Sequence, residues 1–160
     1  MSKILYIARH AKSSWNDLCL SDFERPLNKR GLRDAPFMSK VLKDRVVIPD
    51  IIISSPALRA KATAQYYNDK LRTKLEFNDS IYEASPMTLL YLTQEALQEH
   101  DSIMIIGHNP GLTILNNQLS DKQISNMPTA SIVGIEFGDE IAPYQGKGLF
   151  FEYPKLYFLK

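Results

Sequence analysis

Short apolar segments alternate with helix-type segments along this chain, and the alternation limits the fold more than any other feature. Such an alternation buries its apolar residues most readily as a parallel sheet covered by helices. The strand-type segments are residues 3–8, 50–55, 75–77, 102–107, 131–137 and 148–153. The helix-type segments are residues 29–44, 56–70, 86–99 and 111–119. We predict an α/β fold, a three-layer α/β/α sandwich with a mostly parallel central sheet, helices on both faces and an antiparallel edge strand.

Two of the predicted helices have clear start signals, and one contains a helix breaker. Asn28 is a suitable N-cap for the first helix, and Ser55 for the second, with Pro56 in its first turn. Pro36 lies within the first helix, so we expect a kink or a later start there. Residues 12–28 are polar and mixed in character, and we predict a long functional loop.

The composition is that of one ordinary globular domain. The 160 residues are 44% hydrophobic and 23% charged, so we assign residues 1–160 to a single domain. The formal net charge is +1, without a long block of like charge. This balance argues against a nucleic-acid-binding surface and against electrostatic attachment to a membrane. No apolar segment approaches the ~20 residues that span a bilayer. We expect a cytoplasmic protein.

The chain has one cysteine, Cys19, which excludes an intramolecular disulfide. No histidine lies near it in a recognisable motif that would activate its thiol. We therefore expect a passive, partly buried side chain rather than a nucleophile.

Three predicted strands end in residues that suit an anion. The first strand ends at Arg9 and His10, the second leads to Arg59 in its following helix, and the fourth ends before His108. Because the carboxyl ends of parallel strands meet at one edge of a sheet, we expect these four side chains to converge. Helix N-termini at that edge add positive partial charge and free N–H donors. The sequence therefore predicts an anion pocket.

Each of these residues also has an ordinary structural reading when taken alone. Arg59 could be a solvated residue on the helix surface, and His108 could be a core histidine satisfied by the backbone. Their placement at equivalent strand ends is what favours a site.

Four segments of the chain resemble the histidine phosphatase superfamily, also called the phosphoglycerate mutase-like superfamily. Residues 9–16 resemble its signature, residues 54–64 its second motif, and residues 106–111 its third. Residues 25–31 resemble its proline-leucine-glycine loop. The short length and the alanine after the motif histidine point to the SixA-like branch, the protein phosphohistidine phosphatases.

The resemblance implies a role for each matching residue. His10 would be the nucleophile that takes the phosphoryl group, while Arg9, Arg59 and His108 would hold its oxygens. Asn16 matches an asparagine of the family's phosphate pocket. Glu83 occupies about the place of the family's general acid, although a solvated or capping carboxylate is its alternative reading. We expect no metal and no cofactor.

Two residues depart from the family pattern. Ala11 stands where much of the superfamily has glycine, and Asn28 where a threonine is frequent. A phosphate contact by Asn28 is therefore left open.

The resemblance implies a metal-independent phosphatase that works through a phosphohistidine enzyme intermediate. The resemblance to the SixA-like branch implies phosphohistidine on a protein as the substrate. Such an enzyme could work with a weak general acid or none, because imidazole is a better leaving group than an alkoxide. A small-molecule phosphomonoesterase and a non-catalytic phospho-ligand binding module are the alternatives. His10 must be neutral to attack, so the neighbouring cations should keep it unprotonated and activity should fall at acidic pH.

The C-terminal segment, residues 146–160, is rich in aromatic residues. We expect it to complete the sheet and its edge, with a substrate or dimer surface as the alternative.

Overall fold

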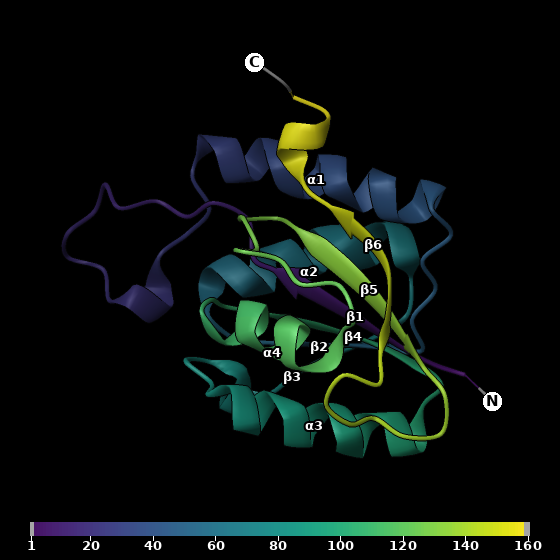
Figure 1. Ribbon diagram of the computed structural model, residues 1–160. Coiled ribbons are helices and arrows are strands. Elements are labelled where there is room, and N and C mark those ends of the chain that lie inside the picture. The colour runs from purple at the N-terminus through teal and green to yellow at the C-terminus, as the bar shows by residue number, and fades with distance from the viewer. Residues whose placement is uncertain (1, 159–160) are drawn as a thin grey trace.

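A six-stranded mixed sheet forms the centre of the computed structural model, which describes residues 2–158 (Figure 1). Residues 1, 159 and 160, the ends of the predicted domain and of the aromatic C-terminal segment, lie outside the described part. The strands are β1 (Lys3–Arg9), β2 (Ile51–Ser54), β3 (Lys74–Phe77), β4 (Ser102–Gly107), β5 (Ile132–Phe137) and β6 (Lys147–Glu152). Their order is β3-β2-β4-β1-β5-β6. The first four are parallel, whereas β5 runs antiparallel to both β1 and β6, which confirms the predicted mixed sheet.

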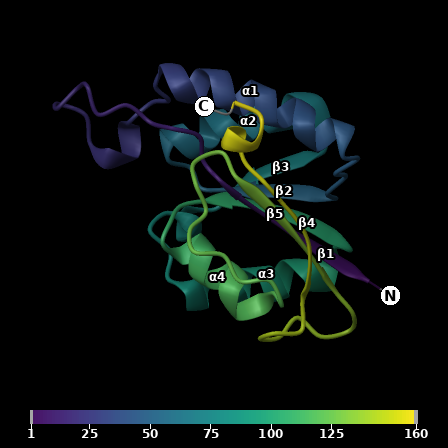
Figure 2. The same cartoon turned by 45° about the horizontal axis from the view of Figure 1, so that its top comes forward.

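Four α-helices cover the sheet, two on each face (Figure 2). They are α1 (Lys29–Asp44), α2 (Leu58–Leu71), α3 (Pro86–Glu99) and α4 (Gly111–Leu119), and three short 3₁₀ helices are η1 (Asp22–Glu24), η2 (Asp79–Ile81) and η3 (Pro154–Leu156). Helices α1 and α2 pack on one face, and α3 and α4 on the other. The α/β/α sandwich is confirmed.

Side-chain alternation along the central strands builds the two halves of the core. On β1, Tyr6 and Ala8 face α1 and α2, whereas Leu5 and Ile7 face α3 and α4. All four are buried, because a strand covered on both faces has no solvent side.

Three details of the helix starts differ from the sequence prediction or refine it. Asn28 caps α1 as expected, with its side chain accepting from Gly31 N at 2.9 Å. The helix then continues through Pro36 without the delayed start that the proline suggested. Ser55 does not cap α2, whose N-cap is Ala57 and whose first residue is Leu58. The Ser55 hydroxyl is instead directed to the site described below.

The long loop between β1 and α1 contains η1 and projects from the carboxyl end of the sheet (Figure 1). Cys19 lies in this loop and is exposed, so the expected partial burial of its thiol is wrong. Within residues 2–158, no helix is long and apolar enough to cross a membrane.

Candidate active site

A small polar pocket lies at the carboxyl end of the parallel strands. Its volume is about 200 Å³. It is lined by Arg9, His10, Lys12, Ser13, Trp15, Arg25, Arg59, His108, Asn109 and Thr129. The register places Arg9 of β1 opposite Gly107 of β4, so the residues that follow these strands are neighbours. The four residues that the strand ends predict as an anion pocket do meet in one place.

His10 is buried and held in one orientation by its two ring nitrogens. Its Nδ1 lies 2.7 Å from the carbonyl oxygen of Ala11, and its Nε2 accepts from Nε of Arg59 at 3.3 Å. A carbonyl only accepts, so Nδ1 carries the proton and Nε2 carries the lone pair. Burial is the main cause that lowers the pKa of His10 to about 3; the hydrogen bond to Ala11 acts against it, and His108 and Arg59 act with it. At neutral pH, His10 is therefore an uncharged ring whose unprotonated Nε2 faces the pocket and accepts from Arg59.

Arg59 lies in the first turn of α2 and contacts three residues with one guanidinium. In addition to its Nε contact with His10, Nη1 donates to the backbone oxygen of Asp22 at 2.7 Å. Nη2 lies 3.0 Å from the Asp22 carboxylate and 3.4 Å from Nδ1 of His108. The side chain is buried, so its planar fork is fixed before any ligand binds.

His108 is also uncharged at neutral pH. Its Nε2 lies 2.7 Å from the Ser55 hydroxyl, and its Nδ1 faces Arg59. Because arginine only donates, Nδ1 is the acceptor and Nε2 carries the proton. Burial, followed by the charge of Arg59, lowers the pKa of His108 to about 4. His108 therefore contributes a hydrogen-bond donor and not a positive charge at neutral pH.

Arg9 brings a half-buried guanidinium with unused donor capacity. Its Nη1 donates to the carbonyl oxygen of Met127 at 2.9 Å. Its Nε is buried and has no hydrogen-bond partner within the described residues. A buried donor without an acceptor is costly, and an oxyanion in the pocket would supply acceptors for this guanidinium.

A carboxylate at the rim of the pocket was not anticipated from the sequence. Asp22, the first residue of η1, accepts from Arg59, from Nη1 of Arg25 at 2.7 Å and from the hydroxyl of Tyr82 at 2.6 Å. The hydrogen bond from Tyr82 is the main cause that lowers the pKa of Asp22 to about 2. The same bond raises the pKa of Tyr82 to about 12. Asp22 is therefore ionised and Tyr82 protonated at neutral pH.

Arg25 fixes the loop that carries Asp22. Its buried side chain donates to Ser13 and to the backbone oxygen of Ser14, and its guanidinium stacks 3.3 Å from the centroid of Trp15. The 25–31 motif was noted in the sequence, but a contact between Arg25 and the pocket was not inferred. No sequence pattern pointed to Asp22 or Tyr82, because their roles depend on contacts between segments far apart in the chain.

Two predicted site residues lie outside the pocket. Asn16 is exposed and does not line the pocket, and its backbone N–H donates to Ser14. Glu83 is also exposed and absent from the lining, in a left-handed conformation with φ of 53°. Their predicted roles in phosphate binding and acid catalysis stay predictions.

Ala11, the departure from the family pattern, is accommodated by the packing beneath the pocket. Its side chain is fully buried, and its backbone N–H donates to the Thr63 hydroxyl at 3.0 Å. Among residues 2–158, no three His, Cys, Asp or Glu side chains are grouped so as to hold a metal ion.

Comparison with known proteins identifies the family of this site. The profile of the histidine phosphatase superfamily (branch 1) matches residues 5–104, which include the first two motifs and Arg59. The chain belongs to the histidine phosphatase superfamily. Membership in this family confirms the predicted phosphatase class at the level of the family.

Solved structures of SixA proteins share the fold of this superfamily member. A protein assigned as the phosphohistidine phosphatase SixA of Agrobacterium tumefaciens superposes with a TM-score of 0.83 at 27% identity. The match covers 95% of this chain and 99% of that one. The protein histidine phosphatase SixA complexed with tungstate gives a TM-score of 0.83 at 22% identity, over 94% and 97% of the two chains. The prediction of the SixA-like branch is confirmed.

An uncharacterized chloroplastic protein of Arabidopsis thaliana is 32% identical over 137 residues. The match covers 78% of this chain and 62% of that protein. This histidine phosphatase superfamily member thus spans about six-tenths of the length of that relative.

Proposed function

We propose that this protein is a metal-independent phosphatase in which His10 takes the phosphoryl group and water then releases it, with phosphohistidine on a protein as substrate. The observation that carries the proposal is the state of His10. Its Nε2 is unprotonated at neutral pH, its ring is fixed by Ala11, and the guanidinium of Arg59 donates to the attacking nitrogen. A neutral, oriented imidazole next to fixed cations is what in-line attack on a phosphoryl group requires.

The reaction then proceeds in two displacements at phosphorus. In the first, Nε2 of His10 forms a bond to phosphorus while the bond from phosphorus to the substrate imidazole breaks. Arg9 and Arg59 neutralise the oxygens, and His108 donates a hydrogen bond once it turns from Ser55. In the second, a water oxygen bonds to phosphorus, the bond to His10 breaks, and the water proton leaves with the phosphate product.

The carboxylate of Asp22 favours a substrate whose leaving group needs no proton from the enzyme. An alkoxide leaves only with a general acid, whereas the imidazole of a phosphohistidine that is protonated on its other ring nitrogen takes the electron pair of the broken bond and leaves as a stable neutral ring. The low pKa of Asp22 makes it a poor acid but a good partner for a cationic imidazolium. Tyr82, whose pKa is about 12, is also a weak acid. These two groups support phosphohistidine over a phosphate ester.

Chemical trapping tests the proposed reaction. The protein is incubated with a phosphohistidine protein labelled on phosphorus, quenched, and analysed for acid-labile, base-stable label. We expect label on His10, loss of label and turnover in His10→Ala, and retention of both in His100→Ala, which changes a histidine at the opposite end of the sheet.

A substrate panel separates the two alternatives. Sugar phosphates hydrolysed faster than phosphohistidine would favour a small-molecule phosphomonoesterase. Binding of phosphate without label or turnover on any substrate would favour a non-catalytic binding module.

A further inference from the structure

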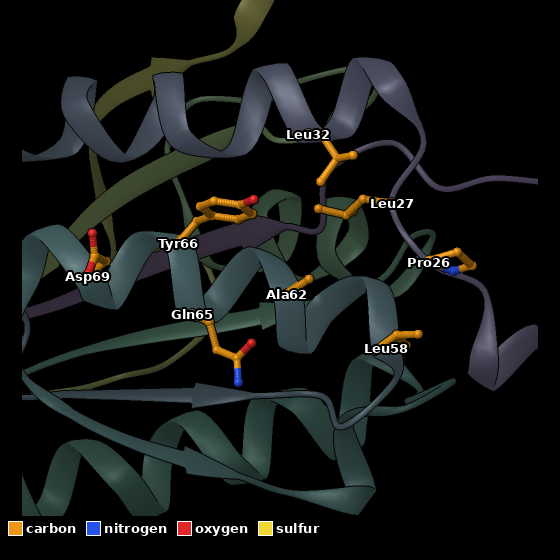
Figure 3. Close-up of a pocket in the computed structure, with 8 residues that line it drawn as sticks. All are labelled: Pro26, Leu27, Leu32, Leu58, Ala62, Gln65, Tyr66 and Asp69. Carbon is orange, nitrogen blue, oxygen red and sulfur yellow. The ribbon is translucent and has the colours of Figure 1, made fainter.

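A second and larger cavity, a groove of about 600 Å³, lies between α1 and α2 and has no part in the proposed reaction (Figure 3). Most of its lining is apolar: Pro26, Leu27, Leu32, Leu58, Ala62 and Tyr66. Leu32, Leu58 and Tyr66 are 52%, 42% and 37% exposed. Apolar side chains that gather in an open groove, and are not scattered singly, are characteristic of a binding surface. We call this cavity the α1–α2 groove.

The α1–α2 groove begins where the phosphate pocket ends. Arg25 and Arg59 line the pocket, and their neighbours in the chain, Pro26 and Leu58, line the groove. Figure 3 shows Pro26 and Leu58 together at one end of the groove. A molecule with its phosphoryl group at His10 therefore meets this apolar surface directly.

The two ends of the groove carry opposite charge. Beyond the pocket end lie the guanidinium groups of Arg25 and Arg59, which share the one carboxylate of Asp22 and so keep a net positive charge. At the other end, near Tyr66, lies the carboxylate of Asp69 (Figure 3). The complementary occupant has an anionic group at one end, apolar side chains in the middle, and a cation at the far end. A phosphorylated segment of protein with a basic residue beyond its apolar residues has this order.

The length of the groove fits a helix of about three turns. Leu58 and Asp69 are eleven residues apart on α2, which corresponds to about 16 Å along the helix axis. An amphipathic helix over that distance presents apolar side chains at intervals of three and four residues to a groove of this kind. The described C-terminal residues leave the groove open, because Tyr157 and Phe158 pack on Phe37 and Arg33, neither of which lines it.

We propose that the α1–α2 groove docks the protein substrate, as the site of an amphipathic helix that carries the phosphohistidine at its anionic end. The apolar face of this helix covers Leu32, Leu58 and Tyr66, and a basic residue about eleven positions away pairs with Asp69. The inference rests on the proposed function and adds to it the feature by which a protein is preferred over a small phosphate.

Synthetic helical phosphohistidine peptides test the apolar contacts. Each pair consists of a leucine peptide and a serine peptide that are otherwise identical. In one pair these residues lie three to eight positions after the phosphohistidine, and in the other pair they lie before it. We expect wild-type kcat/KM to be about tenfold higher for the leucine member of one pair. The preference should vanish in Leu32→Glu and Tyr66→Glu and persist in Tyr91→Glu, a matched change at a side chain 63% exposed on α3.

Hydrolysis of the free phosphohistidine amino acid separates docking from damage to the pocket. Wild type and the three glutamate variants should hydrolyse the free amino acid at equal rates. A similar loss on the free amino acid and the peptides in the groove variants would overturn the inference, and so would equal wild-type rates for leucine and serine peptides. Faster hydrolysis of decyl phosphate than of methyl phosphate, lost in Leu32→Glu, would overturn it in favour of a small-molecule site.

A charge exchange tests the orientation of the helix. The preferred peptide is made with lysine or glutamate eleven positions from the phosphohistidine. Wild type should prefer lysine and Asp69→Lys should prefer glutamate, by roughly fivefold each. An unchanged preference would contradict the assigned orientation. Failure of every phosphohistidine probe, the free amino acid included, would instead overturn the proposed function.

Discussion

Nε of Arg59 donates to Nε2 of His10 at 3.3 Å, so the nitrogen that we propose attacks phosphorus is held in a hydrogen bond. The same contact aligns the guanidinium with the position where the phosphoryl group must bind. In the proposed reaction, a phosphoryl oxygen takes over the donor, and the lone pair of His10 is then free to attack phosphorus. This one hydrogen bond therefore orients both the guanidinium of Arg59 and the imidazole of His10.

Arg59→Lys should lower kcat/KM by roughly 100-fold, the scale of loss on removing one donor from a charged transition state. Lysine keeps the charge but lacks the planar fork that reaches His10, His108 and Asp22 together. Steady-state kinetics on a phosphohistidine peptide measure the effect. Arg45→Lys, at the far end of α1, is the control and should keep the wild-type rate. A loss below threefold in Arg59→Lys would contradict this role.

Asp22→Asn should strengthen inhibition by inorganic phosphate by about tenfold, equivalent to about 1.4 kcal/mol. The reason is that the ionised Asp22 shares Arg59 with the incoming anion and repels it. The inhibition constant for phosphate measures this change, and Asp17→Asn in the same loop is the matched control. The substitution should also shift preference from phosphohistidine toward an aryl phosphate, because the partner of the imidazolium is lost. Weaker phosphate binding in Asp22→Asn would refute the repulsion.

The sequence was sufficient to predict the elements that follow local rules. Alternating strands and helices, the Asn28 cap and the meeting of Arg9, His10, Arg59 and His108 all follow from periodicity and from the geometry of parallel strands. Asp22 could not be predicted, because its partners Arg59 and Tyr82 lie 37 and 60 residues away in the chain. The prediction of Ser55 as an N-cap was wrong for a related reason. Its hydroxyl accepts from Ala57 N and lies near His108, so a residue type that often caps helices is part of the site instead.

The electrostatic state of the pocket also required the structure. The sequence suggested that neighbouring cations keep His10 neutral, whereas burial is the largest cause of its low pKa. Burial is a property of the folded protein, and no local pattern reports its extent. It moves the protonation of His10 to about pH 3, so the expected loss of activity at mildly acidic pH does not come from this residue.

The stability of the fold, rather than the charge of His10 in the folded state, should limit the protein at acidic pH. His10 titrates at about 3 when folded and near 6.5 when unfolded, so the unfolded chain binds the proton first. The free energy of unfolding therefore keeps its full value above pH 6.5. Below that pH, protonation of His10 in the unfolded chain lowers it by about 1.4 kcal/mol per pH unit. His108 has the same sign down to about pH 4.

Urea unfolding at pH 7.5, 6.5 and 5.5 measures this linkage. The midpoint of wild type should fall steeply below pH 6.5, and His10→Gln should flatten the decrease. His100→Gln, outside the pocket, is the matched control. Parallel pH profiles for His10→Gln and wild type would show that His10 is not buried in its neutral form.

Glu83→Gln should change kcat/KM for phosphohistidine by less than threefold, because the carboxyl is exposed and does not line the pocket. The substitution keeps the size of the side chain and leaves the left-handed backbone at this position unchanged. Kinetics on a phosphohistidine peptide and on an alkyl phosphate are compared. Abolished alkyl phosphate turnover with intact phosphohistidine turnover would support Glu83 as an acid that only esters need. Equal large losses on both substrates would contradict the account of the leaving group.

Gly31→Ala should destabilise the fold by about 2 kcal/mol, within the range of overpacking substitutions. Gly31 lies in the first turn of α1, where an added methyl group would overlap the carbonyl oxygen of Lys12. That oxygen also accepts from Asn28 N, so the clash falls on the contact that joins the pocket loop to α1. Gly138→Ala is the control, because a methyl group there meets no atom within 4 Å, and its effect should stay below about 0.5 kcal/mol. Urea unfolding compares the two, and a Gly31→Ala midpoint equal to that of Gly138→Ala would show that the loop yields to the methyl group without cost.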